Sequence, residues 1–245
     1  MRNHFANGRE SIDAVPAVLA SMPKLMDEPY ITSKYQANNL PGLANILKRF
    51  GYSSAFFHGA RNGSMGFEGF SQMAGFQQYY GLNEYPSKKD FDGNWGIFDE
   101  PFLQFCAQKT NEQKQPFINA IFTLSSHSPY TIPTKYVGRF RKGPLEIHES
   151  IGYADYALSQ FFESIKHTPW FKNTLFVITG DHTQQSSEPK YNNEIGAYRV
   201  PLILFHGSQK MNVLLKSKIV PNKITQHADI VPSILDFLDK KYDKL

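Results

Sequence analysis

The stretch TLFVITGDHT (residues 174–183) decides the fold expected for this chain. Its apolar run ends at Gly180 and is followed at once by Asp181 and His182. In α/β proteins, ligands bind beyond the carboxyl ends of strands, so the run predicts a buried strand that leads into a functional site. A carboxylate and an imidazole placed there can bind one divalent ion. The alternative is that Asp181 only caps a turn and His182 is solvated.

Similar patterns recur along the chain. Besides 174–180, strands are predicted at three apolar runs: 54–59, 117–124 and 201–207. Helices are predicted at four segments with helical spacing of apolar residues: 12–21, 40–50, 150–167 and 228–239. Buried strands separated by amphipathic helices indicate an α/β fold with a mixed, mostly parallel sheet covered by helices on both faces.

Two finer expectations follow from the same patterns. The helix at 150–167 is expected to bury one row of side chains: Ile151, Ala154, Leu158, Phe161, Phe162 and Ile165. The segments 59–100 and 127–148 are rich in Gly, Pro, Ser and aromatic residues. They are expected to form long loops with little regular structure, where substrate contacts are often found.

Composition excludes several classes of protein. The 245 residues are 41% hydrophobic and 20% charged, which suits one α/β domain. A single cysteine, Cys106, excludes an intramolecular disulfide and a Cys-rich metal site. The net charge of +4 is small and no basic tract indicates nucleic-acid binding. The polar start MRNHFANGRE does not resemble a signal peptide, and no apolar run is long enough to span a membrane.

Two more histidines stand near the ends of predicted elements. His127, in TLSSHSPY, comes just after the strand predicted at 117–124, and His227, in QHADIVPSIL, begins the last helix. The plain alternatives are a loop histidine bonded to the backbone and a solvated imidazole in a helix cap. Convergence of both with His182 on one sheet edge would indicate a site, provided that the predicted strands are right.

A nucleophile is offered near the amino end by NGRESIDA, in which Ser11 precedes the helix at 12–21. The amino end of a helix favours an anion, and a metal-bound serine there can attack phosphorus. Serine is also a preferred helix cap, and from the spacing alone the capping role is favoured.

These motifs appear in one order: NGRES, HG (58–59), TLSSHSPY, GYADYALSQFF, VITGDHT, YRVPLILF and QHADIVPSIL. The set resembles the alkaline phosphatase/sulfatase superfamily from about residue 7 to residue 238. It is most similar to the lipoteichoic-acid synthase and phosphoglycerol transferase branch. The resemblance implies an alkaline phosphatase-like fold and a Thr or Ser nucleophile that attacks a phosphodiester. A covalent phosphoryl-enzyme would then pass the group to an acceptor hydroxyl or to water.

The resemblance also implies residue roles. Ser11 matches the nucleophile and a metal ligand, while Asp181 and His182 match two further ligands of a divalent ion, usually Mn²⁺, with Zn²⁺ or Mg²⁺ as alternatives. His127 matches a histidine that contacts the substrate phosphate and can serve as acid or base. His227 matches a position that binds metal or phosphate. The implied substrate is a lipid-linked or polyol phosphate at the extracytoplasmic face of the cell membrane.

Three departures from the family pattern carry expectations of their own. The family's first strand, its acidic metal ligand and its membrane anchor precede the nucleophile, so residues 1–245 are expected to be one catalytic domain without them. Where the branch has a Trp-Asn-Arg element, this chain has Met65 and Phe67, and Arg61 is a candidate substitute or a solvated loop charge. Neither Ser11 nor Cys106 has the Pro-x-Arg spacing of formylglycine sulfatases.

Three functions therefore stay open. One is a phosphodiester transferase or hydrolase, and another is an inactive, truncated domain of the same family with a binding role. A phosphoethanolamine transferase or a sulfuric-ester hydrolase on the same fold is the third.

Overall fold

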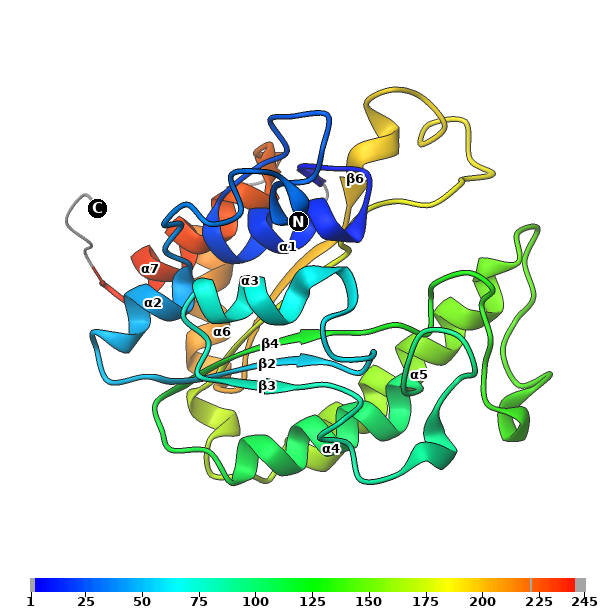
Figure 1. Cartoon of the computed structure of the whole chain (residues 1–245), viewed down its shortest axis with the longest axis horizontal. Helices are drawn as coiled ribbons and strands as arrows, with labels where there is room; N and C mark the ends of the chain where they lie inside the picture. Colours follow the sequence, from blue (N-terminus) through cyan, green and yellow to red (C-terminus); the bar gives the residue numbers. More distant parts are fainter. Residues whose placement is uncertain (1–2, 221, 241–245) are drawn as a thin grey trace. The chain divides into compact units, whose positions relative to one another are not determined.

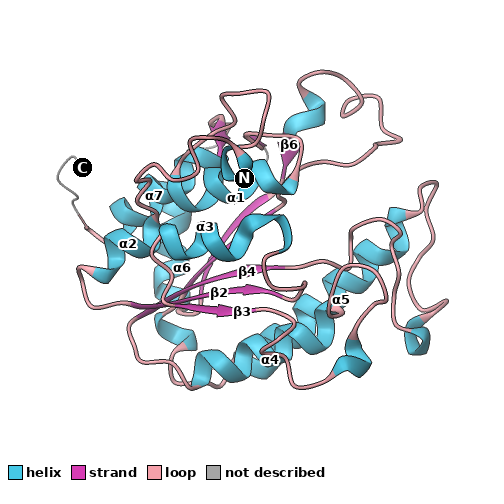
Figure 2. Ribbon diagram, in the orientation of Figure 1, coloured by secondary structure: helices cyan, strands magenta, loops and turns pink. Residues whose placement is uncertain are grey.

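A computed structural model describes residues 3–220 and 222–240, which form two compact units. The first unit comprises the described residues of Met1–Gly51, Met65–Gly75 and Trp170–Leu245, and the second comprises Tyr52–Ser64 and Phe76–Pro169. Figure 1 traces the chain and Figure 2 its secondary structure. The expected single domain over 1–245 stays a prediction.

The first unit contains two small sheets. In one, β1 (His4–Phe5) lies between β6 (Arg199–Val200), which is antiparallel to it, and β8 (Thr225–Gln226), which is parallel. In the other, β5 (Leu175–Thr179) pairs antiparallel with β7 (Leu202–His206). These pairings join the amino end of the chain to two segments near its carboxyl end.

The remaining regular structure of the first unit is helical. Its α-helices are α1 (Ser11–Ala20), α2 (Leu43–Lys48), α3 (Phe67–Met73), α6 (Gln209–Lys218) and α7 (Ile230–Phe237). Short 3₁₀ turns are η1 (Tyr30–Thr32), η5 (Phe171–Asn173), η6 (Gly196–Tyr198) and η7 (His227–Asp229). Helix α1 ends at Ser21, which adopts a left-handed conformation with φ of 53° while its amide bonds to the carbonyl of Pro16.

The second unit is built on a parallel sheet in the order β3 (Gln78–Tyr80), β2 (Ser53–His58), β4 (Phe117–Phe122). Helices α4 (Asp99–Asn111) and α5 (Ile147–Ile165) pack on each other and run along one side of this sheet (Figures 1 and 2). Its 3₁₀ turns are η3 (Lys88–Asp90) and η4 (Thr134–Tyr136), and η2 (Ser64–Gly66) lies where the chain passes to the first unit.

A cluster of fully buried side chains fills the space between β2 and α4: Ala55, Phe57, Ile97, Phe102, Phe105 and Cys106. Burying a Phe or Ile side chain contributes roughly 1.5–3 kcal/mol. Burial also raises the pKa of the Cys106 thiol well above its ordinary value, so this cysteine is an inert core residue.

The expected α/β class is confirmed, and each predicted strand is present to within two residues at either end. The strands form three separate small sheets, however, where one continuous sheet was expected. Among the described strands, three pairs are parallel and two are antiparallel, so the mixed character holds. The two-residue strands β1, β6 and β8 form one sheet of their own, and β5 and β7 form another.

The prediction of a long loop over 59–100 is wrong. Helix α3, strand β3 and the start of α4 lie within it. The helical spacing of Phe67, Phe70 and Ala74, all buried, explains α3. By contrast, 127–148 is mostly irregular, as expected.

The buried face predicted for α5 is also wrong in part. Its buried residues are Ser150, Tyr153, Ala157, Phe161 and Ile165. Ile151 is 48% exposed, although the apolar pattern placed it on the inner row. Residues 150, 153 and 157 have the same helical spacing as the predicted apolar row. The positions of apolar residues in the sequence therefore could not decide which of the two rows is buried.

No helix within residues 3–220 and 222–240 is long and apolar enough to cross a membrane.

Two isoleucines on α5 test this corrected face. Ile165 is fully buried while Ile151 is 48% exposed. Ile165→Ala is expected to lower the free energy of unfolding by about 2–5 kcal/mol because it leaves a cavity. Ile151→Ala, the matched control, should change it by less than about 0.5 kcal/mol. Urea-induced unfolding of both variants gives the comparison, and equal losses would contradict the assigned face.

The buried imidazole that ends β2 makes stability depend on pH. His58 is 1% exposed, and burial lowers its pKa from 6.5 to about 4. As the pH falls, the unfolded chain therefore takes up this proton before the folded one does. The stability that His58 contributes is complete above pH 6.5 and is lost as the pH falls to about 4.

We expect this group to account for up to roughly 3 kcal/mol of acid destabilisation. His58→Phe, which cannot titrate, should therefore lose less stability than the wild type across that window. Urea unfolding at pH values on either side of the window measures the slope. Parallel pH curves for the two proteins would refute the assignment.

Candidate active site

Three predicted site residues meet in the first unit. The Ser11 hydroxyl donates a hydrogen bond of 2.6 Å to Oδ2 of Asp181 and lies 3.3 Å from Nε2 of His182. The same Nε2 lies 3.4 Å from Asp181 Oδ2. Residues 170 positions apart in the sequence thus place one nitrogen and two oxygen atoms within reach of one another.

Local structure explains this meeting. Ser11 is the first residue of α1, and Asp181 and His182 follow directly after β5 and Gly180. Ser11 is buried at 7% exposure, whereas the Asp181 side chain is 34% exposed. The cluster is therefore open to solvent on the carboxylate side.

The orientation of His182 is fixed by a bond to its neighbour. Its Nδ1 lies 2.9 Å from the carbonyl oxygen of Thr183, which can only accept, so Nδ1 carries the proton. Nε2 then presents its lone pair toward Ser11 and Asp181. This is the tautomer that a metal-binding histidine needs.

Behind the cluster lies His227, which is fully buried. Its Nε2 lies 2.9 Å from the carbonyl oxygen of Gly180, and the amide of Asn7 lies 3.4 Å from its Nδ1. Burial is the main cause that lowers its pKa. His227 therefore supports the backbone next to Asp181, and its predicted role in binding substrate stays a prediction.

A second buried histidine, His4, was not identified from the sequence. Its Nδ1 lies 2.9 Å from the Thr225 hydroxyl, and its ring lies 5.4 Å from that of His227. Within the described residues its Nε2 has no hydrogen-bond partner. Burial and the neighbouring His227 lower the pKa of His4 to about 4. In the sequence His4 lies in the polar segment MRNHFANGRE, and this pattern does not indicate that its side chain is buried.

The donor chemistry of the cluster fits a divalent ion. A hydroxyl, a carboxylate and a neutral imidazole suit Mn²⁺, Zn²⁺ or Mg²⁺, and three protein ligands with open positions are typical of a catalytic site. Within the described residues, no group of three or more His, Cys, Asp or Glu side chains is placed to hold a metal ion. Asp181 and His182 are therefore the two ligands of these residue types in the cluster. Ser11 is thus needed as the third donor.

The other two predicted residues belong to the second unit. His127 follows β4, and its Nδ1 lies 2.8 Å from the carbonyl oxygen of Ser128. Arg61 is exposed, and its carbonyl oxygen accepts a bond from the amide of Ser64. Their roles toward substrate stay predictions.

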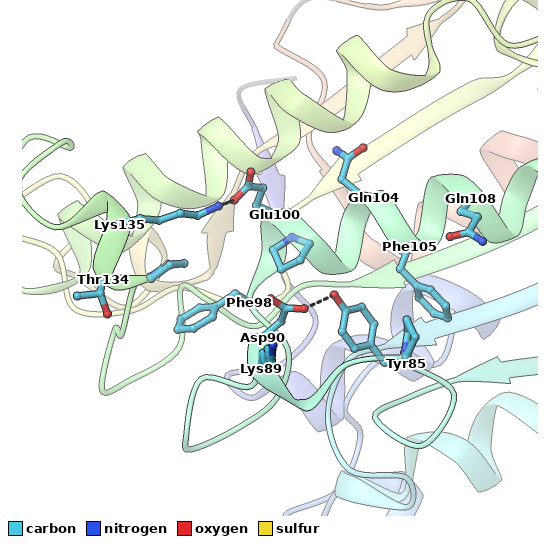
Figure 3. A pocket seen from close by; sticks show the side chains of 13 residues that line it. Tyr85, Lys89, Asp90, Phe98, Glu100, Gln104, Phe105, Gln108, Thr134 and Lys135 are labelled. Carbon is cyan, nitrogen blue, oxygen red and sulfur yellow. Dashed lines mark hydrogen bonds and ion pairs between the residues drawn. The ribbon is translucent and has the colours of Figure 1, made fainter.

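A groove of about 570 Å³ also lies in the second unit (Figure 3). Three of its four charged side chains bond to neighbouring side chains: Lys135 lies 3.0 Å from Glu100, and the Tyr85 hydroxyl donates to Asp90. None of the predicted site residues lines it.

Comparison with known proteins identifies relatives over much of the chain. A model of the family described as Sulfatase matches residues 1–240. Phosphoglycerol transferase I of Citrobacter koseri is 28% identical over 163 residues, which are 62% of this chain and 21% of the relative. Lipoteichoic acid synthase 1 of Bacillus subtilis is 27% identical over 151 residues, or 59% of this chain and 24% of the relative. The chain therefore corresponds to less than a quarter of each relative's length.

Solved structures share its fold. A protein of the alkaline phosphatase superfamily from Vibrio parahaemolyticus superposes with a TM-score of 0.80 at 22% identity, over 97% of this chain and 57% of that one. Phosphoglycerol transferase GacH of Streptococcus pyogenes, in complex with sn-glycerol-1-phosphate, gives 0.66 at 13% identity, over 98% and 65%. The C-terminal periplasmic domain of EcEptC from Escherichia coli, in complex with Zn, gives 0.65 at 16% identity, over 96% and 70%.

At these identities the structural matches establish the alkaline phosphatase-like fold alone. The family model, in turn, covers almost the entire sequence. The chain thus belongs to the sulfatase family, and it is related to phosphoglycerol transferase I and lipoteichoic acid synthase.

Proposed function

We propose that this chain is the catalytic part of a metal-dependent phosphodiester transferase or hydrolase that uses Ser11 as its nucleophile. One observation carries the proposal: the Ser11 hydroxyl lies 2.6 Å from Asp181 Oδ2 and 3.3 Å from His182 Nε2. A serine that only capped a helix would bond to backbone amides of its own first turn. Ser11 instead bonds to a carboxylate 170 residues away.

The reaction proceeds in two displacements. The Ser11 hydroxyl loses its proton as its oxygen forms a bond to phosphorus. The bond from phosphorus to the leaving alkoxide breaks, and the alkoxide oxygen takes up a proton. The phosphoserine is then attacked by an acceptor hydroxyl or water, which loses its proton, and the serine oxygen leaves as the hydroxyl is restored. The two steps transfer one phosphoryl-containing group and regenerate the enzyme.

Ser11, Asp181 and His182 would hold the metal. A divalent ion bound there would lower the pKa of the serine hydroxyl and neutralise charge on the phosphate oxygens. The position of Ser11 at the amino end of α1 adds the positive end of the helix dipole, which favours an anionic group at this point.

Roles for the other predicted residues, His127, Arg61 and His227, are part of the proposal. His127 has its Nδ1 proton directed to Ser128, so its Nε2 can exchange a proton with the leaving or attacking oxygen. Arg61, exposed on its loop, is proposed to bind substrate phosphate. His227 is also proposed to bind substrate, in addition to its bond to the Gly180 carbonyl.

A polyol phosphate is the proposed substrate class. Support comes from the two curated relatives, whose names specify phosphoglycerol transfer and lipoteichoic acid synthesis, and from the glycerol phosphate bound to GacH. Mn²⁺ is the proposed ion, with Zn²⁺ or Mg²⁺ as alternatives. A location on the extracytoplasmic side of the membrane agrees with the periplasmic domain of EcEptC.

Metal binding can be measured without any assay of activity. We expect the chain to bind one Mn²⁺, seen as loss of the free-ion signal in electron paramagnetic resonance. Asp181→Asn and His182→Gln should each weaken binding by at least about 10-fold, because each removes a donor. Asp155→Asn, at an exposed position on α5, is the matched control and should bind as the wild type does. Equal binding by all four proteins would place the ion elsewhere.

The nucleophile is tested by hydrolysis of a chromogenic phosphodiester in the presence of Mn²⁺. Ser11→Ala should lower kcat by at least about 10³-fold, because no other group can form the covalent intermediate. Ser71→Ala is the control, since that buried hydroxyl bonds only to Glu68 within its own helix. Its activity should stay within about twofold of the wild type.

The outcomes separate the rival functions. Metal binding without hydrolysis of phosphate or sulfate esters would favour the inactive domain with a binding role. Hydrolysis that persists in Ser11→Ala would contradict the proposed nucleophile. Preferential hydrolysis of an ethanolamine phosphate or a sulfate ester would change the proposed substrate class, while the proposed roles of Ser11, Asp181 and His182 would stay the same.

A further inference from the structure

The His127 loop is organised by its own backbone and by one side-chain bond. The amide of His127 donates to the carbonyl of Leu124 at 3.0 Å, and the amide of Tyr130 donates to the carbonyl of His127 at 2.8 Å. The imidazole Nδ1 donates to the Ser128 carbonyl at 2.8 Å. The bond to Ser128 places the proton of the His127 imidazole on Nδ1. It does not by itself fix the tilt of the ring, which a contact with the ring face can do.

Trp95 occupies that face. Its ring centre lies 4.3 Å from the centre of the His127 ring, with the two planes inclined at 57°. Its indole nitrogen donates to the Ser128 carbonyl at 2.6 Å. One carbonyl oxygen, which has two lone pairs, therefore receives both Trp95 and His127. The tryptophan constrains the imidazole directly by ring contact and indirectly through their shared acceptor.

The backbone of Trp95 is itself fixed by a turn. Oδ1 of Asp92 accepts bonds from the amides of Asn94, Trp95 and Gly96, at 2.8, 2.8 and 3.0 Å. At Gly96 a Cβ atom would lie 2.4 Å from the carbonyl oxygen of Gly59, so the segment packs on the end of β2 with no room for a side chain. The indole is thus presented from a closely packed turn.

A buried carboxylate then ties this segment to the histidine loop. Oδ1 of Asp99 accepts bonds from the amides of Leu124 and Ser125, at 2.8 and 3.0 Å, and the Asp99 amide donates to the Ser125 hydroxyl. Asp99 is 1% exposed. The stretch from Asp92 to Asp99 therefore holds the His127 loop at two points, one at the start of the loop and one at the imidazole.

We infer that Trp95 is a positioning residue for His127, holding the imidazole in the single orientation in which Nδ1 is bonded to the Ser128 carbonyl and Nε2 is left to exchange a proton. This inference rests on the proposed function of His127. Trp95 is 38% exposed, so the burial of its apolar surface does not by itself explain why a tryptophan occupies this position. Its two specific contacts are both to the histidine loop.

The test separates the ring contact from the hydrogen bond. Trp95→Phe keeps an aromatic face and loses the indole N–H, whereas Trp95→Leu loses both. Trp170→Phe, at the only other tryptophan, is the matched control. Circular dichroism identifies any variant that fails to fold, and the two substitutions at position 95 ensure that at least the milder one can be compared.

Two readouts are taken from each variant. In proton–carbon correlation spectra, the His127 ring signals, assigned by their loss in His127→Gln, should move downfield in Trp95→Leu as the indole ring current is removed. In the phosphodiester assay, kcat of Trp95→Leu should fall between about 10- and 100-fold with a smaller change in KM. Trp95→Phe should recover part of both effects, and Trp170→Phe should show neither.

Each outcome has one meaning. Unmoved His127 signals in Trp95→Leu, or a kcat within about twofold of the wild type, would overturn the positioning role. If the wild type has no activity but the signals move, the proposed function fails while the contact between Trp95 and His127 stands. A fall in kcat that is equal in Trp95→Phe and Trp95→Leu would assign the effect to the indole N–H and overturn the role of the ring.

Discussion

The hydrogen bond from Ser11 to Asp181 depends on how the first unit holds residues near the start of the chain against residues 180–228. Strand β1 does this by pairing with β8, and Asn7 extends the connection through two side-chain bonds: to the Gln226 side chain and from the Ala228 amide, both at 2.8 Å. The amino end of α1 is thereby fixed against the segment that carries His227. That histidine in turn bonds to Gly180, next to Asp181. The geometry of the Ser11–Asp181–His182 cluster thus depends on contacts between residues more than two hundred positions apart.

These contacts require His227 to be neutral. The Asn7 amide needs a lone pair on Nδ1, and the Gly180 carbonyl needs a proton on Nε2, so only one tautomer of the uncharged ring satisfies both. A charged ring would have two donors and would leave the Asn7 amide facing an N–H group. Burial, which lowers the pKa of His227, therefore acts in the same direction as the hydrogen bonds. The neighbouring His4 ring, with its pKa lowered to about 4, adds no charge to the pair.

Sequence patterns located four of the described strands and four of the helices, and they missed α4, α6 and the two-residue strands β1, β6 and β8. The joint site of Ser11, Asp181 and His182 was implied by the family resemblance. Continuous apolar runs located β2, β4, β5 and β7. The expected burial of β4, β5 and β7 is not met, since the side chains of β4 and β5 are half-buried and Ile203 of β7 is exposed. Reasoning from the sequence also placed Asp181 and His182 after a strand and Ser11 at a helix start. It missed α3 and β3, whose aromatic residues lie among glycines, and it missed Trp95 and His4. Trp95 matters through its contact with the His127 ring, and His4 through its burial. Neither property produces a periodic pattern in the sequence.

The histidines divide into two kinds by how their nitrogens are used. His127 and His182 each direct Nδ1 to the carbonyl of the next residue, at 2.8 and 2.9 Å, which leaves Nε2 available for other groups. His227 uses both nitrogens in bonds to the protein backbone. An imidazole needs a free nitrogen to bind a metal or exchange a proton, so the local bond to the following carbonyl is what prepares the first two for chemistry. The available Nε2 of His127 and His182 thus agrees with the roles proposed for them, whereas both nitrogens of His227 bond to the backbone.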